Sequence, residues 1–131
     1  MATITELCEQ LADAYEVQGL PVRENLQPGI SREDLLRAVA PLRIAIPDEI
    51  IELYSWRNGH FLEFDPDRHR NLRFRDGIFL PAEQIVDEYS RIQKSYGLHS
   101  TLAMDRVDLR ATIPISAFEG SWDVVACGAH L

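Results

Sequence analysis

The sequence predicts an α+β fold in which helices pack on one side of a mostly antiparallel sheet. Segments with helical periodicity dominate the chain before Gly59, and strand-like segments with one inserted helix follow it. The chain has 131 residues, of which 46% are apolar and 26% are charged, an ordinary globular mixture. That length suits one core, so residues 1–131 are expected to form a single domain.

The first helix is expected to begin at Thr3, because Thr3 and Glu6 form a T-x-x-E capping box. Gly19 can adopt the left-handed conformation that ends helices, and Pro21 prevents the helix from continuing. The apolar residues that recur at helical spacing, and so predict its buried face, are Ile4, Leu7, Leu11 and Ala14, with Cys8 and Tyr15 beside them.

Residues 21–30 contain two prolines and a glycine among charged residues, which predicts a loop. Ser31 is expected to cap a second, short helix, whose first turn carries two carboxylates at the positive end of the helix dipole. Its predicted buried residues are Leu35, Leu36 and Val39, and Pro41 closes it.

A third helix is expected from Pro47, which suits the first helical position. Asn58 and Gly59 tolerate positive φ, so they are expected to end this helix and reverse the chain toward Phe61. The side chains predicted to bury its inner face are Ile50, Leu53 and Tyr54.

The second half of the chain is expected to supply the sheet. Pro114 predicts an edge strand over residues 112–115, because proline cannot donate to a neighbouring strand. The other expected strands are residues 60–64, 72–75 before an Asp76-Gly77 turn, 78–80, and 122–127 as an inner strand. One amphipathic helix, carrying Ile85, Val86, Tyr89 and Ile92, is expected to end near Gly97, and residues 98–111 fit no single pattern.

The charge pattern bears on partners. The net charge is −8, which disfavours generic nucleic-acid binding. Residues 1–65 carry 12 acidic and 5 basic residues, a net −7, so the helical half is expected either to be a merely soluble surface or to steer a basic protein partner. A basic run from Arg68 to Arg75 is better interpreted as solvated hairpin arginines than as an RNA or phosphate site.

Cysteine usage and the N-terminal segment predict a cytoplasmic protein. Cys8 and Cys127 are too few for a disulfide scaffold and belong to no metal-binding spacing. The first residues lack a basic region and a continuous apolar stretch, so no signal peptide is predicted. No window approaches the roughly 20 apolar residues that span a bilayer, so no membrane contact is expected.

Catalytic chemistry has no strong signature, and neither a metal nor a cofactor is expected. The four histidines (His60, His69, His99 and His130) are scattered, and no phosphate-binding glycine loop or nucleophile elbow occurs. Cys127 and His130 are close enough in sequence to be considered as metal ligands or as a nucleophile pair, so a small cysteine hydrolase is an alternative. A buried strand thiol is the favoured interpretation of Cys127.

Residues 46–59, IPDEIIELYSWRNG, resemble a signature of the SUKH superfamily, in which a proline-capped helix ends in Asn-Gly. The sequence also resembles other segments of the family, in the same order, at residues 26–31, 79–85, 113–115 and 122–125. The turn at residues 118–121 has fewer glycines than is typical. Family members also continue through further strands and a closing helix, so an open sheet edge is expected here, covered by a partner or a second copy.

The superfamily joins bacterial toxin-immunity proteins to a fungal cell-wall-assembly regulator. The resemblance therefore implies a non-catalytic binding protein, most simply an immunity protein that covers a basic toxin domain, with a regulatory or scaffold protein as the alternative. The residues expected to have a structural role in these motifs are Pro47, Leu53, Asn58, Gly59 and Trp122. Charge near the signature suggests the partner contacts Glu49, Glu52, Glu63 and Asp65, together with Trp56 as either a core residue or a partly exposed anchor.

Overall fold

The computed structural model describes residues 2–61, 78–96, 109–118 and 121–127. Their helices and antiparallel strands confirm the α+β class. The α-helices are α1 (Ile4–Val17), α2 (Arg32–Val39), α3 (Asp48–Trp56) and α5 (Ala82–Tyr96), with short 3₁₀ turns at η1 (Arg23–Asn25), η2 (Ala40–Leu42) and η3 (Leu109–Ala111). The strands are β1 (Leu26–Pro28), β2 (Arg57–His60), β3 (Ile78–Phe79), β4 (Thr112–Phe118) and β5 (Ser121–Ala126).

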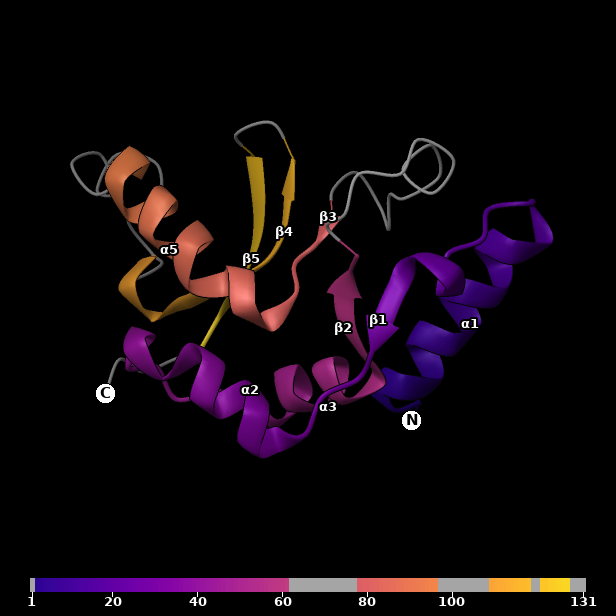
Figure 1. Cartoon of the computed structure of the whole chain (residues 1–131), viewed down its shortest axis with the longest axis horizontal. Coiled ribbons are helices and arrows are strands. Elements are labelled where there is room, and N and C mark those ends of the chain that lie inside the picture. The colour runs from indigo at the N-terminus through magenta and orange to yellow at the C-terminus, as the bar shows by residue number, and fades with distance from the viewer. Residues whose placement is uncertain (1, 62–77, 97–108, 119–120, 128–131) are drawn as a thin grey trace.

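The helices form an arc around the strands (Figure 1). They contact one another in the order α5, α2, α3 and α1, and α5 also packs on β4. Among the described strands, β1 and β2 form one antiparallel pair, and β3, β4 and β5 form a separate antiparallel sheet in that order. The single sheet expected from the sequence is thus divided into two small ones.

Helix α1 confirms the predicted capping box and corrects the predicted buried face. Thr3 Oγ1 accepts the Glu6 N–H at 3.1 Å, and Glu6 Oε2 accepts the Thr3 N–H at 3.3 Å. The helix ends before Gly19, which has a φ of +85°. The side chains that pack inward are Ile4, Cys8, Ala12 and Tyr15, whereas Leu7, Leu11 and Ala14 are exposed. Both rows have helical spacing, so periodicity alone could not select between them.

The loop expected over residues 21–30 contains the short elements η1 and β1. Gly29 approaches the end of α3 so closely that a Cβ there would lie 1.8 Å from the Ser55 carbonyl oxygen. Its neighbour Ile30 donates its N–H to the Tyr54 carbonyl at 2.9 Å. Ser31 then caps α2 as predicted, accepting the Asp34 N–H at 3.1 Å, and Leu35 and Val39 are buried while Leu36 is half-buried.

Helix α3 is shorter at both ends than the sequence predicted. Pro47 is its N-cap residue, one position before the predicted role, and the helix ends at Trp56. Asn58 and Gly59 lie in β2 and so do not form the expected chain reversal. Gly59 does take the predicted positive φ, at +72°. Ile50 and Tyr54 are buried as predicted, and Leu53 is half-buried.

The prediction that residues 112–115 form an edge strand is wrong. β4 is central and β5 pairs only with β4 among the described strands. Pro114 is tolerated because β3 pairs with β4 only at Ser116 and Ala117, and the β4–β5 register shifts beside the proline. Strand β3 and helix α5 agree with prediction, whereas most of the strand expected at 60–64, the 72–75 hairpin and the Arg68–Arg75 basic run fall outside the described residues.

Candidate protein-binding surface

The Asn-Gly pair of the family-like signature connects β2 to the start of α5. Asn58 Oδ1 accepts the Ala82 N–H at 2.8 Å, and its Nδ2 donates to Glu83 Oε2 at 3.2 Å. At Gly59, a Cβ would lie 2.3 Å from the Pro81 nitrogen. The two residues therefore serve packing between distant segments.

Two buried side chains beside this pair have the same structural purpose. Tyr54 donates its hydroxyl to the Leu80 carbonyl at 2.7 Å, and its burial raises its pKa well above the ordinary value. His60 is buried and accepts the Phe79 N–H on Nδ1 at 2.8 Å. Of the four histidines, only His60 lies within the described residues; the others are His69, His99 and His130.

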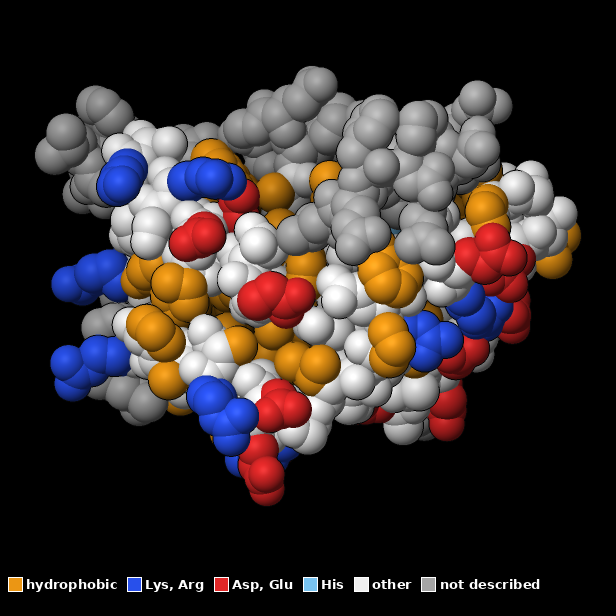
Figure 2. Space-filling model, in the orientation of Figure 1, with side chains coloured by type: hydrophobic (Ala, Val, Ile, Leu, Met, Phe, Trp, Pro, Cys, Tyr) orange, Lys and Arg blue, Asp and Glu red, His pale blue; other side chains and the backbone are white. Residues whose placement is uncertain are grey.

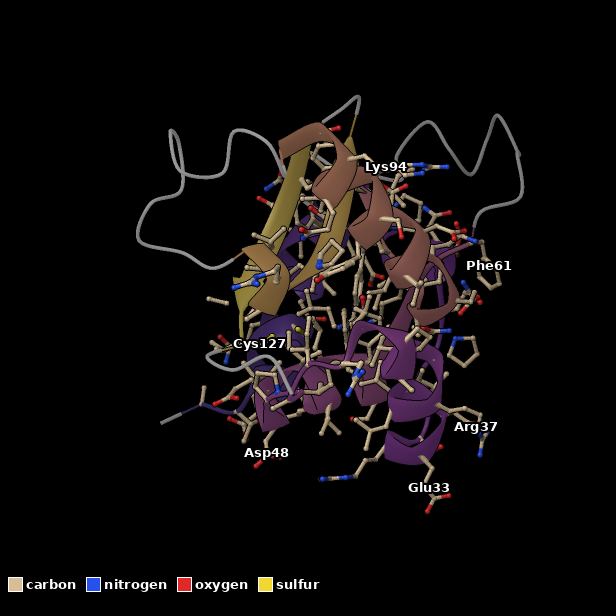
Figure 3. All side chains as sticks on the ribbon, turned by 90° about the vertical axis from the view of Figure 1, so that its left-hand side faces the viewer. Glu33, Arg37, Asp48, Phe61, Lys94 and Cys127 are labelled. Carbon is tan, nitrogen blue, oxygen red and sulfur yellow. The ribbon has the colours of Figure 1, made fainter. Side chains whose placement is uncertain are left out.

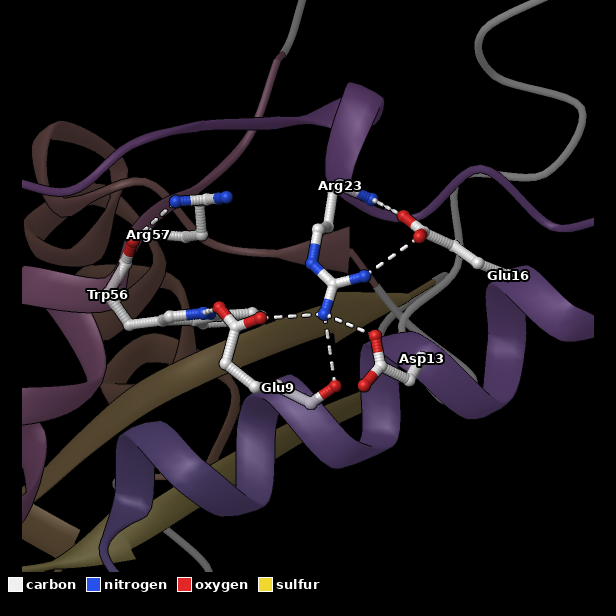
Figure 4. Close-up of polar contacts among 6 residues, drawn as sticks. All are labelled: Glu9, Asp13, Glu16, Arg23, Trp56 and Arg57. Atoms are coloured by element: carbon white, nitrogen blue, oxygen red, sulfur yellow. Dashed lines mark hydrogen bonds and ion pairs between the residues drawn. The ribbon is translucent and has the colours of Figure 1, made fainter.

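A cluster of charged side chains connects α1 to η1, and we call it the Arg23 cluster (Figure 4). Arg23 reaches Glu9 Oε2 at 2.6 Å, Asp13 Oδ1 at 2.8 Å and Glu16 Oε2 at 2.8 Å. The three carboxylates are spaced by four and three residues, so they share one side of α1. The hydrogen bonds that Arg23 donates to Glu9 and, to a lesser extent, to Asp13 raise its pKa above the ordinary value.

Glu9 extends this cluster to α3. Its Oε1 accepts the indole N–H of Trp56 at 2.5 Å. That bond and the bond from Arg23 lower the pKa of Glu9 below its ordinary value. Trp56 is only 6% exposed, and the guanidinium of Arg57 lies 5.5 Å from the centre of the indole ring. Of the two positions considered for Trp56 from the sequence, the structure therefore shows the core one.

The predicted contact residues do not all lie on a free surface. Glu49 is exposed in the first turn of α3. Glu52 is half-buried, and its Oε1 accepts the Thr5 N–H at 3.1 Å, so it connects α3 to the start of α1. Glu63 and Asp65 fall outside the described residues. Trp122, predicted as structural, donates its indole N–H to Glu88 Oε2 at 2.7 Å and so joins β5 to α5.

Exposed carboxylates are distributed over the surface of residues 2–61, which contain α1, α2 and α3 and which we call the helical face. Residues 2–61 carry ten acidic and five basic side chains. Acidic side chains gather with basic ones at the α1 end of the molecule in Figure 2, and Glu33 and Asp48 project outward from α2 and α3 in Figure 3. The exposed acidic residues of this segment are Glu6, Asp13, Glu16, Glu24, Glu33, Asp34, Asp48 and Glu49.

The side of α1 that carries Leu7, Leu11 and Ala14, which we call its outer half, was predicted from the sequence to be buried and is exposed in the structure. Leu7 is 50% exposed and Leu11 is 40% exposed. Glu6 directly precedes Leu7, Asp13 follows Leu11 by two residues, and both carboxylates are exposed. The i, i+4, i+7 spacing of Glu9, Asp13 and Glu16 in the sequence was an available signal for the Arg23 cluster. The return of Arg23 to that row depends on how the chain folds after Pro21.

Neither cysteine has the environment of an activated nucleophile. Burial raises the pKa of the Cys8 thiol, and the charges of Glu52 and Glu9 raise it further. Burial also raises the pKa of Cys127, and its Sγ donates to the Val125 carbonyl at 3.4 Å. Both thiols are therefore mostly protonated at neutral pH, which is the unreactive form. His130, the partner considered for Cys127, lies outside the described residues.

Within the described residues, no group of three or more His, Cys, Asp or Glu side chains is arranged to hold a metal ion. The same part of the chain contains no helix with the length and apolar character needed to cross a membrane. A comparison with known proteins finds no family model that matches this sequence and no curated protein that is similar to it.

Proposed function

We propose that this chain is a non-catalytic protein-binding domain that neutralises a basic toxin domain by covering its surface. The observation that carries the proposal is the excess of exposed carboxylates on the helical face. A surface with this charge attracts a basic protein and repels nucleic acid and anionic lipid. The family resemblance of residues 46–59 supports the immunity role in particular.

The environment of the thiols favours binding over catalysis. A cysteine hydrolase needs a thiolate, and both described cysteines have raised pKa values. Polar residues in and directly after the signature also support a structural interpretation, because Asn58 and His60 use their side chains to hold the backbone of α5 and β3.

Co-expression tests the proposal directly. Toxin genes near the gene for this chain would be expressed in a host with and without it, and growth would be scored. We expect one basic toxin domain to be neutralised and to co-elute with this chain in size-exclusion chromatography. Failure of every neighbouring toxin to be neutralised or bound would contradict the immunity role.

A thiol probe separates binding from hydrolysis. The native chain would be treated with iodoacetamide at pH 7, and labelling of Cys8 and Cys127 would be measured by mass spectrometry. We expect labelling at least tenfold slower than in urea, because the native thiols are protonated and partly buried. Fast native labelling of Cys127 would instead favour the hydrolase.

A further inference from the structure

We infer that the outer half of α1 is the docking surface for the partner, and that it fits a basic, amphipathic helix. This inference rests on the proposed function and deepens it by naming the surface and the chemistry of the segment that binds there. The surface consists of Leu7, Leu11 and Ala14 in one row of α1, together with Glu6 and Asp13, each of which directly precedes a member of that row in the sequence.

The leucines are available because α1 packs through its other row. Cys8 and Ala12 are buried against the core, while Leu7 and Leu11 keep half or nearly half of their surface in contact with solvent. The capping box holds the first turn in place, and the Arg23 cluster anchors the helix along its length. The leucine row is therefore presented on a fixed helix, and Glu6 and Asp13 also take part in the capping box and the Arg23 cluster that hold it.

Charge determines which occupant fits. Residues 4–25 carry five carboxylates and one arginine. Arg23, which binds Glu9, Asp13 and Glu16, offsets only one of these five charges, so the segment stays acidic. A second copy would bring two acidic helices together, and anionic lipid or nucleic acid would be repelled in the same way. Leucines beside carboxylates instead match a helix that carries apolar residues along one face and lysine or arginine next to them.

The size of the apolar row also favours a partner with complementary charge. Two partly exposed leucines offer far less area than the roughly 800 Å² that each partner contributes to a standard stable interface. They are sufficient to anchor one face of a helix, provided that charge pairs contribute around them.

A synthetic peptide provides the probe. It would be an amphipathic helix of about 18 residues with leucines on one face and lysines beside them, and a second peptide would carry glutamate in place of lysine. Each would be titrated into the isotopically labelled full chain and followed by NMR. We expect the lysine peptide to shift the amide signals of residues 4–17, and the glutamate peptide to leave them unchanged.

Variants of α1 give the decisive comparison. L7S/L11S and E6Q/D13N are each expected to weaken binding of the lysine peptide at least fivefold. L7M/L11M, which keeps the apolar row, and Asp87→Asn on the exposed face of α5 are expected to bind within twofold of the wild type. Glutamine can still accept the Thr3 N–H at position 6, and D13N removes only one of the three carboxylates that bind Arg23, so α1 stays anchored. Circular dichroism would establish that each variant is folded. If L7S/L11S is unfolded, E6Q/D13N alone decides.

The inference is overturned if the lysine peptide leaves residues 4–17 unshifted at millimolar concentration, or if the folded variants bind it like the wild type. A toxin that is neutralised equally well by L7S/L11S and by the wild-type chain would also overturn it, while the proposed function would stand. Peptide binding at α1 in a chain that neutralises no toxin would contradict only the proposed function.

Discussion

Gly59 is the residue at which backbone conformation and packing are most closely coupled. Its φ of +72° is unfavourable for other residues, and its missing Cβ makes room for the backbone of residues 79–81. Gly19 has a similar φ of +85°, but no heavy atom lies within 4 Å of a Cβ built there. Substitutions at Gly59 and Gly19 can therefore separate the energetic cost of a positive φ from the cost of a steric clash.

Gly59→Ala is expected to lower the free energy of unfolding by about 3 kcal/mol, because both costs apply. Gly19→Ala is the matched control and is expected to lower it by only about 1 kcal/mol, because conformation alone is affected. Urea denaturation of the two variants would measure the difference. Equal losses would contradict a close approach at Gly59.

Glu9 should make the stability depend on pH in the acidic range. Hydrogen bonds from Trp56 and Arg23 lower its pKa in the folded state below the ordinary value of 4.5. Ionised Glu9 therefore stabilises the fold above that value, and this contribution is lost as the pH falls through the lower, native pKa.

Glu9→Gln is expected to be less stable than the wild type at pH 7, with the difference shrinking progressively below about pH 4.5. Trp56→Phe keeps an aromatic ring and removes the indole donor to Glu9, so it should reduce the change in stability between pH 3 and pH 7. Thermal unfolding between pH 3 and pH 7 would test both. A difference between wild type and Glu9→Gln that is constant across this range would contradict the bonding shown in Figure 4.

At the scale of elements, the start of α5 depends on a side chain from β2. The N-terminal N–H groups of a helix lack partners within the helix. Asn58 supplies one by accepting the Ala82 N–H at 2.8 Å in a buried environment. This bond explains physically why an asparagine occupies the residue before Gly59.

Asn58→Ala is expected to lower the free energy of unfolding by about 2 kcal/mol, because it leaves the buried Ala82 N–H without its acceptor. Glu83→Gln serves as the control, since Glu83 is exposed and glutamine can still accept from Asn58; a loss below about 1 kcal/mol is expected. Hydrogen exchange would locate the effect at the first turn of α5. Unchanged protection there in a destabilised Asn58→Ala variant would contradict this role.

At the scale of the whole molecule, charge should control how fast the chain meets a basic partner. The protein carries a net charge of −8, and most of that excess lies in the helical half. Long-range attraction raises the association rate and is screened by salt. Dissociation depends mainly on short-range contacts and should respond much less.

The association rate with the proposed toxin partner is expected to fall about tenfold when ionic strength rises from about 0.02 M to about 0.5 M. Replacing Glu24, Glu33 and Glu49 with glutamine should make this dependence weaker, whereas Asp87→Asn on α5 should change it little. Stopped-flow fluorescence would give the rates. A rate that is indifferent to salt would contradict electrostatic steering.

Local sequence determined much of this protein. The capping box at Thr3, the Ser31 cap, the positive φ of Gly59 and the α+β class all follow from short-range rules, and the structure agrees with each. These features depend on bonds within a few residues or on one residue's own conformational freedom. Trp56 and Glu52 were expected from the sequence to contact a partner. Their burial was not predictable in the same way, because each binds a residue of α1 that is distant in the sequence.

Tertiary packing alone decided which apolar row of α1 is buried, which strand is central and where Arg23 binds. Two rows of α1 have the same helical period, so only the position of the core leaves Leu7 and Leu11 exposed. Pro114 is in a central strand because β3 is too short to pair beside it. In each case the deciding contact joins residues far apart in the chain, and no local pattern encodes such a contact.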